Sequence, residues 1–208
     1  MMISYQELVR TFLSKENKPS YECMITAETC LGLAGMTTED WLRDHHCRTG
    51  IIFTAFAIEA MFIFYRKQVD TNYNKKQRED RKTMHKNTLM LCGINNYIGT
   101  RSYQIVKECL DVRDAIAHGD SYTSTFNFLA GDLNKQDDIT RRVIAVNSEQ
   151  FRGLTIERLR KYIEMAKHID YEISDKGYRP FESDLPIDER RKLILAFGVS
   201  GVSMWPSS

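Results

Sequence analysis

The sequence predicts a mainly α-helical protein, an antiparallel helical bundle with one small β-hairpin inserted late in the chain. Apolar residues recur at helical spacing through most of the sequence, and residues that begin or stop helices flank these stretches. Only one region is rich in β-branched and aromatic residues. The 208 residues, 42% hydrophobic and 27% charged, are enough for one domain with a sizeable core.

Charge and cysteine content narrow the class of protein. A net charge of +1 argues against a protein that coats nucleic acid through its overall charge, so any contact with RNA must come from a local patch. The five cysteines are odd in number and include no CxxC pair, which is typical of reduced thiols. The start of the chain lacks the basic and apolar segments of a signal peptide. We therefore expect a cytoplasmic protein.

Capping patterns place the helices of the first half. Ser4 with Glu7, and Thr37 with Asp40, have the spacing of capping boxes, and Gly50 is a candidate break within the second of these helices. The helices expected here span about residues 4–18, 20–33, 37–69, 80–92 and 101–118, with Gly93 and Gly119 as stops after the last two.

The most apolar stretch is residues 51–65, interrupted only by Thr54 and Glu59. Its fifteen residues fall short of the roughly 20 that span a bilayer, so we expect a core helix and no membrane partner. A carboxylate in such a helix is costly unless it is paired. Glu59 could pair with Arg113 or with a lysine of a neighbouring helix, and the residues alone leave both open.

The pattern changes after residue 119. Residues 122–129 and 139–146 predict the β-hairpin, and Ser148 is expected to cap a final long helix. The apolar tail, 193–205, could be a docked element or a segment that binds a partner. The expected organisation is an N-terminal helical extension packed on the bundle (1–36), a helical domain (37–175) and a C-terminal tail (176–208).

One helix end brings together residues that suit RNA cleavage. Arg113, Asp114 and His118 precede the stop at Gly119. Arginine can grip a phosphate bidentately, and histidine can transfer protons near neutral pH. Asp114 lies four residues before His118, on nearly the same helix face, and could orient the imidazole. The same residues could instead form a structural capping arrangement with an ion pair.

Five residues turn a helix by about 140°, so Arg113 and His118 would not share one face of a straight helix. Either the histidine swings off the last turn, or a second copy of the chain supplies the missing partner across a two-fold axis. Both arrangements remain open at this point.

The string 112–119, VRDAIAHG, resembles the signature of the HEPN superfamily, an arginine followed by a polar residue and, after four to six spacers in all, a histidine. The resemblance covers roughly residues 37–175. It implies a bundle that dimerises and a metal-independent endoribonuclease without a cofactor, acting as a toxin or phage-defence effector. Arg113 and His118 would then be catalytic, and Asp114 would support them. Apart from the resemblance, Glu59 could hold Arg113 in its working rotamer or form only a structural ion pair. Other members are non-catalytic scaffolds or ligand sensors, and an antitoxin or regulatory protein is a further expected partner.

Residues 66–86 carry an excess of positive charge in a nearly neutral chain, which indicates either an RNA-backbone patch or a solvated helix face. The candidate RNA-binding residues are Lys75, Lys76, Arg78, Arg81 and Lys82. His45, His46 and Cys47 are adjacent, and adjacent residues diverge on a helix, so we expect no metal site there. His85 and His168 are expected at the surface or at the boundary of the core.

Overall fold

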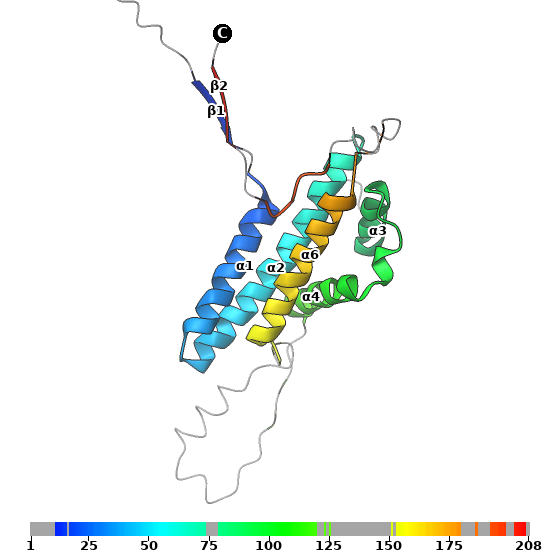
Figure 1. Cartoon of the computed structure of the whole chain (residues 1–208). Coiled ribbons are helices and arrows are strands. Elements are labelled where there is room, and N and C mark those ends of the chain that lie inside the picture. The colour runs from blue at the N-terminus through cyan, green and yellow to red at the C-terminus, as the bar shows by residue number, and fades with distance from the viewer. Residues whose placement is uncertain are drawn as a thin grey trace, which may run out of the picture.

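The protein is mainly helical (Figure 1). A computed structural model describes residues 11–15, 17–73, 79–119, 123, 125, 151, 153–179, 186, 192–198 and 202–206. Within these ranges the elements are β1 (Thr11–Lys15), α1 (Pro19–Met36), α2 (Asp40–Val69), α3 (Arg81–Leu91), the 3₁₀ turn η1 (Tyr97–Gly99), α4 (Arg101–His118), α6 (Ile156–Lys176) and β2 (Val202–Pro206). The predicted hairpin at 122–129 and 139–146 lies outside the described residues, apart from two isolated positions.

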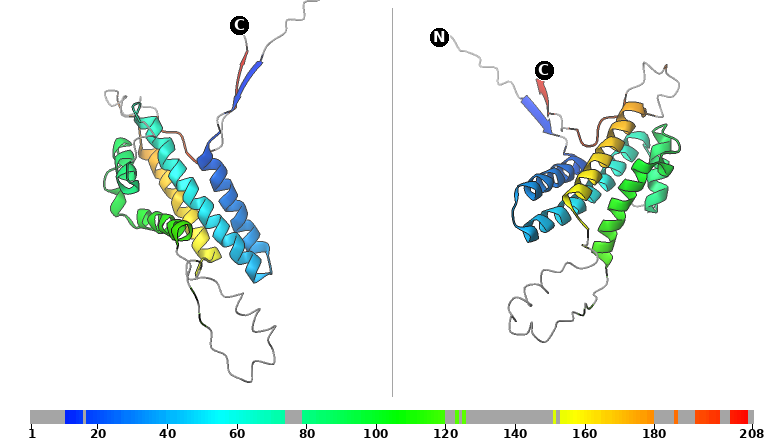
Figure 2. Two further views of the ribbon diagram at one scale, coloured as in Figure 1. Left: turned by 180° about the vertical axis from the view of Figure 1, so that it is seen from behind. Right: turned by 60° about the horizontal axis from the view of Figure 1, so that its bottom comes forward.

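Three helices, α1, α2 and α6, lie side by side, and α3 and α4 cover another side of α2 (Figures 1 and 2). α1 and α2 form an antiparallel hairpin. The order of colours along the ribbons shows that α6 runs in the same direction as α2. The bundle is therefore not antiparallel throughout, because a long connection separates α4 from α6 and returns the chain to the starting end of α2.

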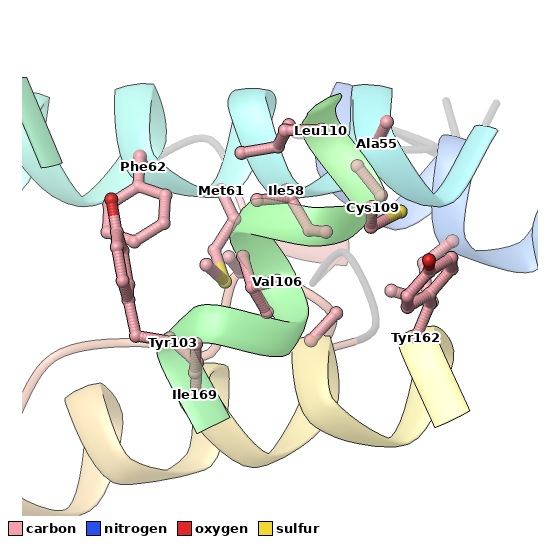
Figure 3. Packing of buried hydrophobic residues seen from close by; sticks show 14 of the residues in the cluster. Ala55, Ile58, Met61, Phe62, Tyr103, Val106, Cys109, Leu110, Tyr162 and Ile169 are labelled. Carbon is pink, nitrogen blue, oxygen red and sulfur yellow. The ribbon is translucent and has the colours of Figure 1, made fainter. Parts of the chain in front are cut away.

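The core forms where α2, α4 and α6 meet. Phe62 of α2, Val106 and Leu110 of α4, and Ile169 of α6 point into the same region (Figure 3). α2 is long and apolar enough to cross a bilayer by length and composition. Half of its most apolar window is buried against the other helices, which is the arrangement of a core helix.

Gly50 does not break α2, which is continuous from Asp40 to Val69. A Cβ at this position would lie 2.6 Å from a methyl carbon of Leu159 and 3.1 Å from the Cβ of Cys30. The glycine instead allows α1 and α6 to approach α2 closely.

Side-chain caps fix the starts of three helices. Asp80 accepts a hydrogen bond from the Thr83 backbone N–H, and Thr100 accepts one from that of Tyr103. Thr155 caps α6 in the same way, so this helix begins at Ile156 and not after Ser148 as predicted. α2 begins at Asp40 without a side-chain cap, although Thr37 and Asp40 suggested a capping box. Gly93, with φ of +77°, follows α3 as expected.

The prediction of a helix up to residue 18 is wrong for Thr11–Lys15, which form β1. This strand pairs antiparallel with β2, matching Phe12 with Trp205. The spacing of residues in one segment cannot reveal a strand whose partner lies at the other end of the chain. The predicted Ser4–Glu7 cap lies outside the described residues.

Part of the C-terminal tail is docked, one of the two roles the sequence left open. The buried carboxylate of Asp170 in α6 accepts hydrogen bonds from the backbone N–H groups of Ala196 (2.8 Å) and Phe197 (2.9 Å). Ser20 of α1 donates to the Ala196 carbonyl at 2.8 Å. Residues 192–198 therefore join α1 to α6, and α1 is an integral part of the bundle.

Candidate functional site

The site begins with Arg113, which projects from α4 toward α2. Its guanidinium forms an ion pair with Glu59, the first of the two pairings that the sequence allowed. The guanidinium also lies 5.6 Å from the centre of the Phe56 ring, within the range of a cation–π contact. Only 15% of the Arg113 side chain is exposed, so packing and charge together hold it in one orientation.

Two further residues complete a charged cluster, which we call the Arg113 cluster: Glu59, Arg81, Arg113 and Asp114. Arg81, from the first turn of α3, donates two hydrogen bonds to the Asp114 carboxylate, at 2.7 and 3.0 Å. It also lies 3.3 Å from Glu59, the same distance that separates Arg113 from Asp114. Two cations and two anions thus alternate between α2, α3 and α4.

The hydrogen bonds from Arg81 hold the pKa of the Asp114 carboxyl below its ordinary value. The charges of Arg113 and His118 lower this pKa further, in the same direction. The sequence predicted that Asp114 would accept a hydrogen bond from His118. Among the described residues, its side-chain hydrogen bonds instead come from Arg81, because the guanidinium fork matches a carboxylate better than an imidazole does.

His118 is the last residue of α4 and is exposed. α4 remains helical to this residue, so the rotation of about 140° between positions 113 and 118 applies. Arg113 faces α2, and no hydrogen bond joins it to His118 within the described residues. A single copy of the chain therefore does not bring the two motif side chains together.

Of the five candidate RNA-binding residues, Lys75, Lys76 and Arg78 lie outside the described residues. Lys82 is exposed at the start of α3, as a phosphate-binding residue would be. Arg81 does not belong to a free basic surface, because its guanidinium is bound by Asp114 and Glu59.

His85 contradicts the prediction of a surface or boundary position, because it is fully buried. Its ring stacks on Phe62 with centroids 3.7 Å apart, and its Nδ1 lies 3.0 Å from the Tyr103 hydroxyl. Burial lowers its pKa from 6.5 to about 3, and the Arg81 charge acts in the same direction. The sequence held a sign of this, since positions 85, 88, 89 and 92 have core spacing and are all buried.

No group of three or more His, Cys, Asp or Glu side chains that could hold a metal ion occurs among the described residues. His168 is exposed, as expected. Comparisons of this chain with protein-family models, with curated proteins and with solved structures give no match.

Proposed function

We propose that this protein is a cytoplasmic, metal-independent endoribonuclease of the HEPN type, a toxin or phage-defence effector that acts as a homodimer. The observation that carries the proposal is the arrangement of Arg113 and His118 at the C-terminal end of α4. Arg113 is fixed in orientation by Glu59, and His118 is exposed on the final turn of the same helix. A two-fold copy would supply the histidine that one chain cannot bring to its own arginine.

The chemistry requires a cation and a proton carrier, because RNA supplies its own nucleophile. The 2′-hydroxyl attacks the adjacent phosphorus, and the 5′-oxygen leaves, giving a 2′,3′-cyclic phosphate and a 5′-hydroxyl end. His118 would accept or donate the proton of one of these oxygens. Arg113 would offset the negative charge that develops on the phosphate.

The Arg113 cluster sets a condition on this reaction. Its two guanidinium groups are balanced by two carboxylates, so a phosphate must compete with Glu59 or Asp114 for the guanidinium N–H groups of Arg113. Glu59 would act as a positioning residue that holds Arg113 between encounters with RNA. An antitoxin or regulatory protein that covers this helix end would restrain the enzyme.

The test is cleavage of total RNA by the purified full chain in the presence of EDTA. We expect products that end in a 2′,3′-cyclic phosphate, and loss of cleavage in both His118→Ala and Arg113→Ala. His168→Ala, which removes another exposed histidine, is the matched control and should cleave as the wild type does. Intact RNA with wild-type protein, together with harmless overexpression whether or not His118 is present, would refute the proposal.

The ion pairs of Arg113 with two carboxylates favour a second candidate. Its guanidinium is already bound by Glu59 and Asp114, as in a structural ion pair. The protein would then be a non-catalytic HEPN-like module that binds a partner protein or a small ligand. In that case Arg113→Ala lowers the melting temperature but removes no activity, whereas a catalytic role predicts loss of cleavage by His118→Ala with an unchanged melting temperature.

A further inference from the structure

A cavity of about 350 Å³ lies between the start of α1 and the C-terminal half of α2. We call it the α1–α2 cavity. Its volume is within the roughly 300–1,000 Å³ that is usual for small-molecule sites. At about 30 Å³ for each group the size of a water molecule, it has room for about twelve non-hydrogen atoms. None of its lining residues belongs to the Arg113 cluster, so a ligand bound here would be separate from the cleavage reaction.

One wall of the cavity is apolar. Pro19 of α1 and Ala60, Ile63 and Phe64 of α2 supply it. The three residues of α2 are only partly buried by the rest of the described chain. Their side chains carry no hydrogen-bonding group, so this wall favours a hydrocarbon chain.

The polar part of the lining is cationic. Lys18 and Lys67 contribute two positive charges, and no acid is among the described residues that line the cavity. Lys67 is exposed and forms no ion pair with any described residue. An anionic group that enters the cavity would therefore meet positive charge that no neighbouring carboxylate offsets.

Lys18 differs from an ordinary surface lysine, because only 3% of it is exposed. Its Nζ lies 5.2 Å from the centre of the Phe64 ring, so the ammonium lies against the apolar wall. Within the described residues it donates one hydrogen bond, to the Leu195 carbonyl at 3.2 Å, and forms no ion pair. An ammonium has three N–H donors, and burying it without a counter-ion is unfavourable. An anion beside Lys18 would therefore stabilise the folded chain.

The buried carboxylate of Asp170 does not fill this role. It accepts hydrogen bonds from the Tyr65 hydroxyl and from the backbone N–H groups of Ala196 and Phe197, and it forms no ion pair with Lys18. Two N–H donors of the Lys18 ammonium therefore remain available to a ligand.

The docked tail holds the polar lining in place. The tail reaches the start of α1 (Figure 1), where the Lys18 and Ser20 side chains donate to backbone carbonyls of residues 195 and 196. Gln68 of α2 exchanges two longer hydrogen bonds with the backbone of Ile194, at 3.3 and 3.5 Å. All three side chains line the cavity, so their orientations are fixed before a ligand arrives, which lowers the entropic cost of binding.

We propose that the α1–α2 cavity binds a small monocarboxylate with an aliphatic chain of about eight carbons, the size that its volume allows. The carboxylate would lie beside Lys18, with Lys67 at the rim, and the chain would pack along Ile63 and Phe64. One carboxylate charge matches the single buried ammonium, whereas a phosphate would bury additional negative charge. Arginine, whose planar fork binds phosphate bidentately, is not among the described residues of the lining.

A series of ligands tests the apolar wall and the cation separately. Calorimetry on the full-length chain would compare butanoate, hexanoate and octanoate with octan-1-ol, which has the chain of octanoate without its charge. Each methylene that enters an apolar site strengthens binding about fourfold, so affinity should rise by roughly tenfold or more from each acid to the next. Octan-1-ol should bind about tenfold more weakly than octanoate, because it lacks the charge that Lys18 recognises.

Three variants and one control locate the site. Lys18→Met keeps an unbranched side chain without the charge, and this variant should bind octanoate no more tightly than octan-1-ol. Ala60→Phe places a ring in the cavity and should weaken binding of every ligand. Lys67→Ala removes only the exposed charge, should weaken octanoate binding about threefold, and keeps the test valid if Lys18→Met undocks the tail. Lys161→Ala removes an exposed lysine of α6 outside the lining and should bind as the wild type does.

Octanoate binding that grows with chain length and requires Lys18 would support the assignment. Equal affinities of the wild type for octanoate and octan-1-ol would overturn it, because the cavity would then recognise no anion. Absence of binding by every acid, unchanged binding by Ala60→Phe, or equal weakening by Lys161→Ala and Lys67→Ala would also overturn it.

Discussion

The buried imidazole of His85 should make the protein lose stability in mild acid. In the folded chain burial lowers the pKa of His85 to about 3, whereas an unfolded imidazole has the ordinary value of 6.5. At a pH between these two pKa values, His85 is protonated in the unfolded state but not in the folded state. Folding stability attributable to this group is therefore complete above pH 6.5 and is lost as the pH falls towards 3.

The size of the effect follows from the two pKa values. Each unit of difference corresponds to about 1.4 kcal/mol, so the full loss is about 5 kcal/mol. At pH 5 only the first part of this range has been crossed, and the expected loss relative to pH 7 is about 2 kcal/mol. A loss of this size is a substantial fraction of the roughly 5–15 kcal/mol that stabilises a typical domain.

Urea unfolding at pH 7 and at pH 5 measures this loss directly. Carboxylates also begin to titrate near pH 5, so the wild type is compared with His85→Leu, in which the titrating ring is absent. The wild type should lose about 2 kcal/mol more than His85→Leu between the two pH values. His168→Gln, which removes an exposed histidine, should retain the wild-type loss. Equal losses in wild type and His85→Leu would refute the argument.

Three further sets of substitutions test the packing and the charged cluster by chemical unfolding. Asp170→Ala leaves two backbone N–H donors of the docked tail unpaired and should lower the free energy of unfolding by about 3 kcal/mol. Asp175→Ala, on the surface of the same helix, should lower it by less than about 0.5 kcal/mol. Equal losses would contradict the docking. Gly32→Ala, which meets no neighbour, should stabilise α1 by up to about 1 kcal/mol, whereas Gly50→Ala should lack this gain because of Leu159. Glu59→Gln should cost about 1–2 kcal/mol by leaving the mostly buried Arg113 with only the more distant carboxylate of Asp114. An unchanged unfolding midpoint would show that Asp114 suffices.

Local chemistry explains the features that could be predicted from the sequence. The stop of α4 at Gly119 and the turn at Gly93 were predicted correctly, and Asp80 lies where a capping residue was needed. The pairing of Glu59 with Arg113 was one of two options, and choosing between them required knowing that α2 and α4 are neighbours.

Three of the failures share a different cause, since each depends on a contact far away in the chain. β1 needs β2, nearly 190 residues later, and the role of Gly50 is visible only once Leu159 is packed against it. Arg81 was read as part of a basic surface because its acceptor, Asp114, lies 33 residues away. His85 is the exception, because its spacing from Leu89 and Cys92 is that of a core position and could have corrected the prediction.

The parallel return of α6 has a consequence for synthesis of the protein on the ribosome. Leu159, Ile163 and Ile169 cover the apolar side of α2, and residues 192–198 then seal the end of the bundle. A growing chain that has produced only the first 150 residues leaves this side of α2 uncovered and exposed to chaperones. Translation must be nearly complete before the helix that carries Arg113 and His118 is locked in place, so prematurely terminated chains would lack a finished site.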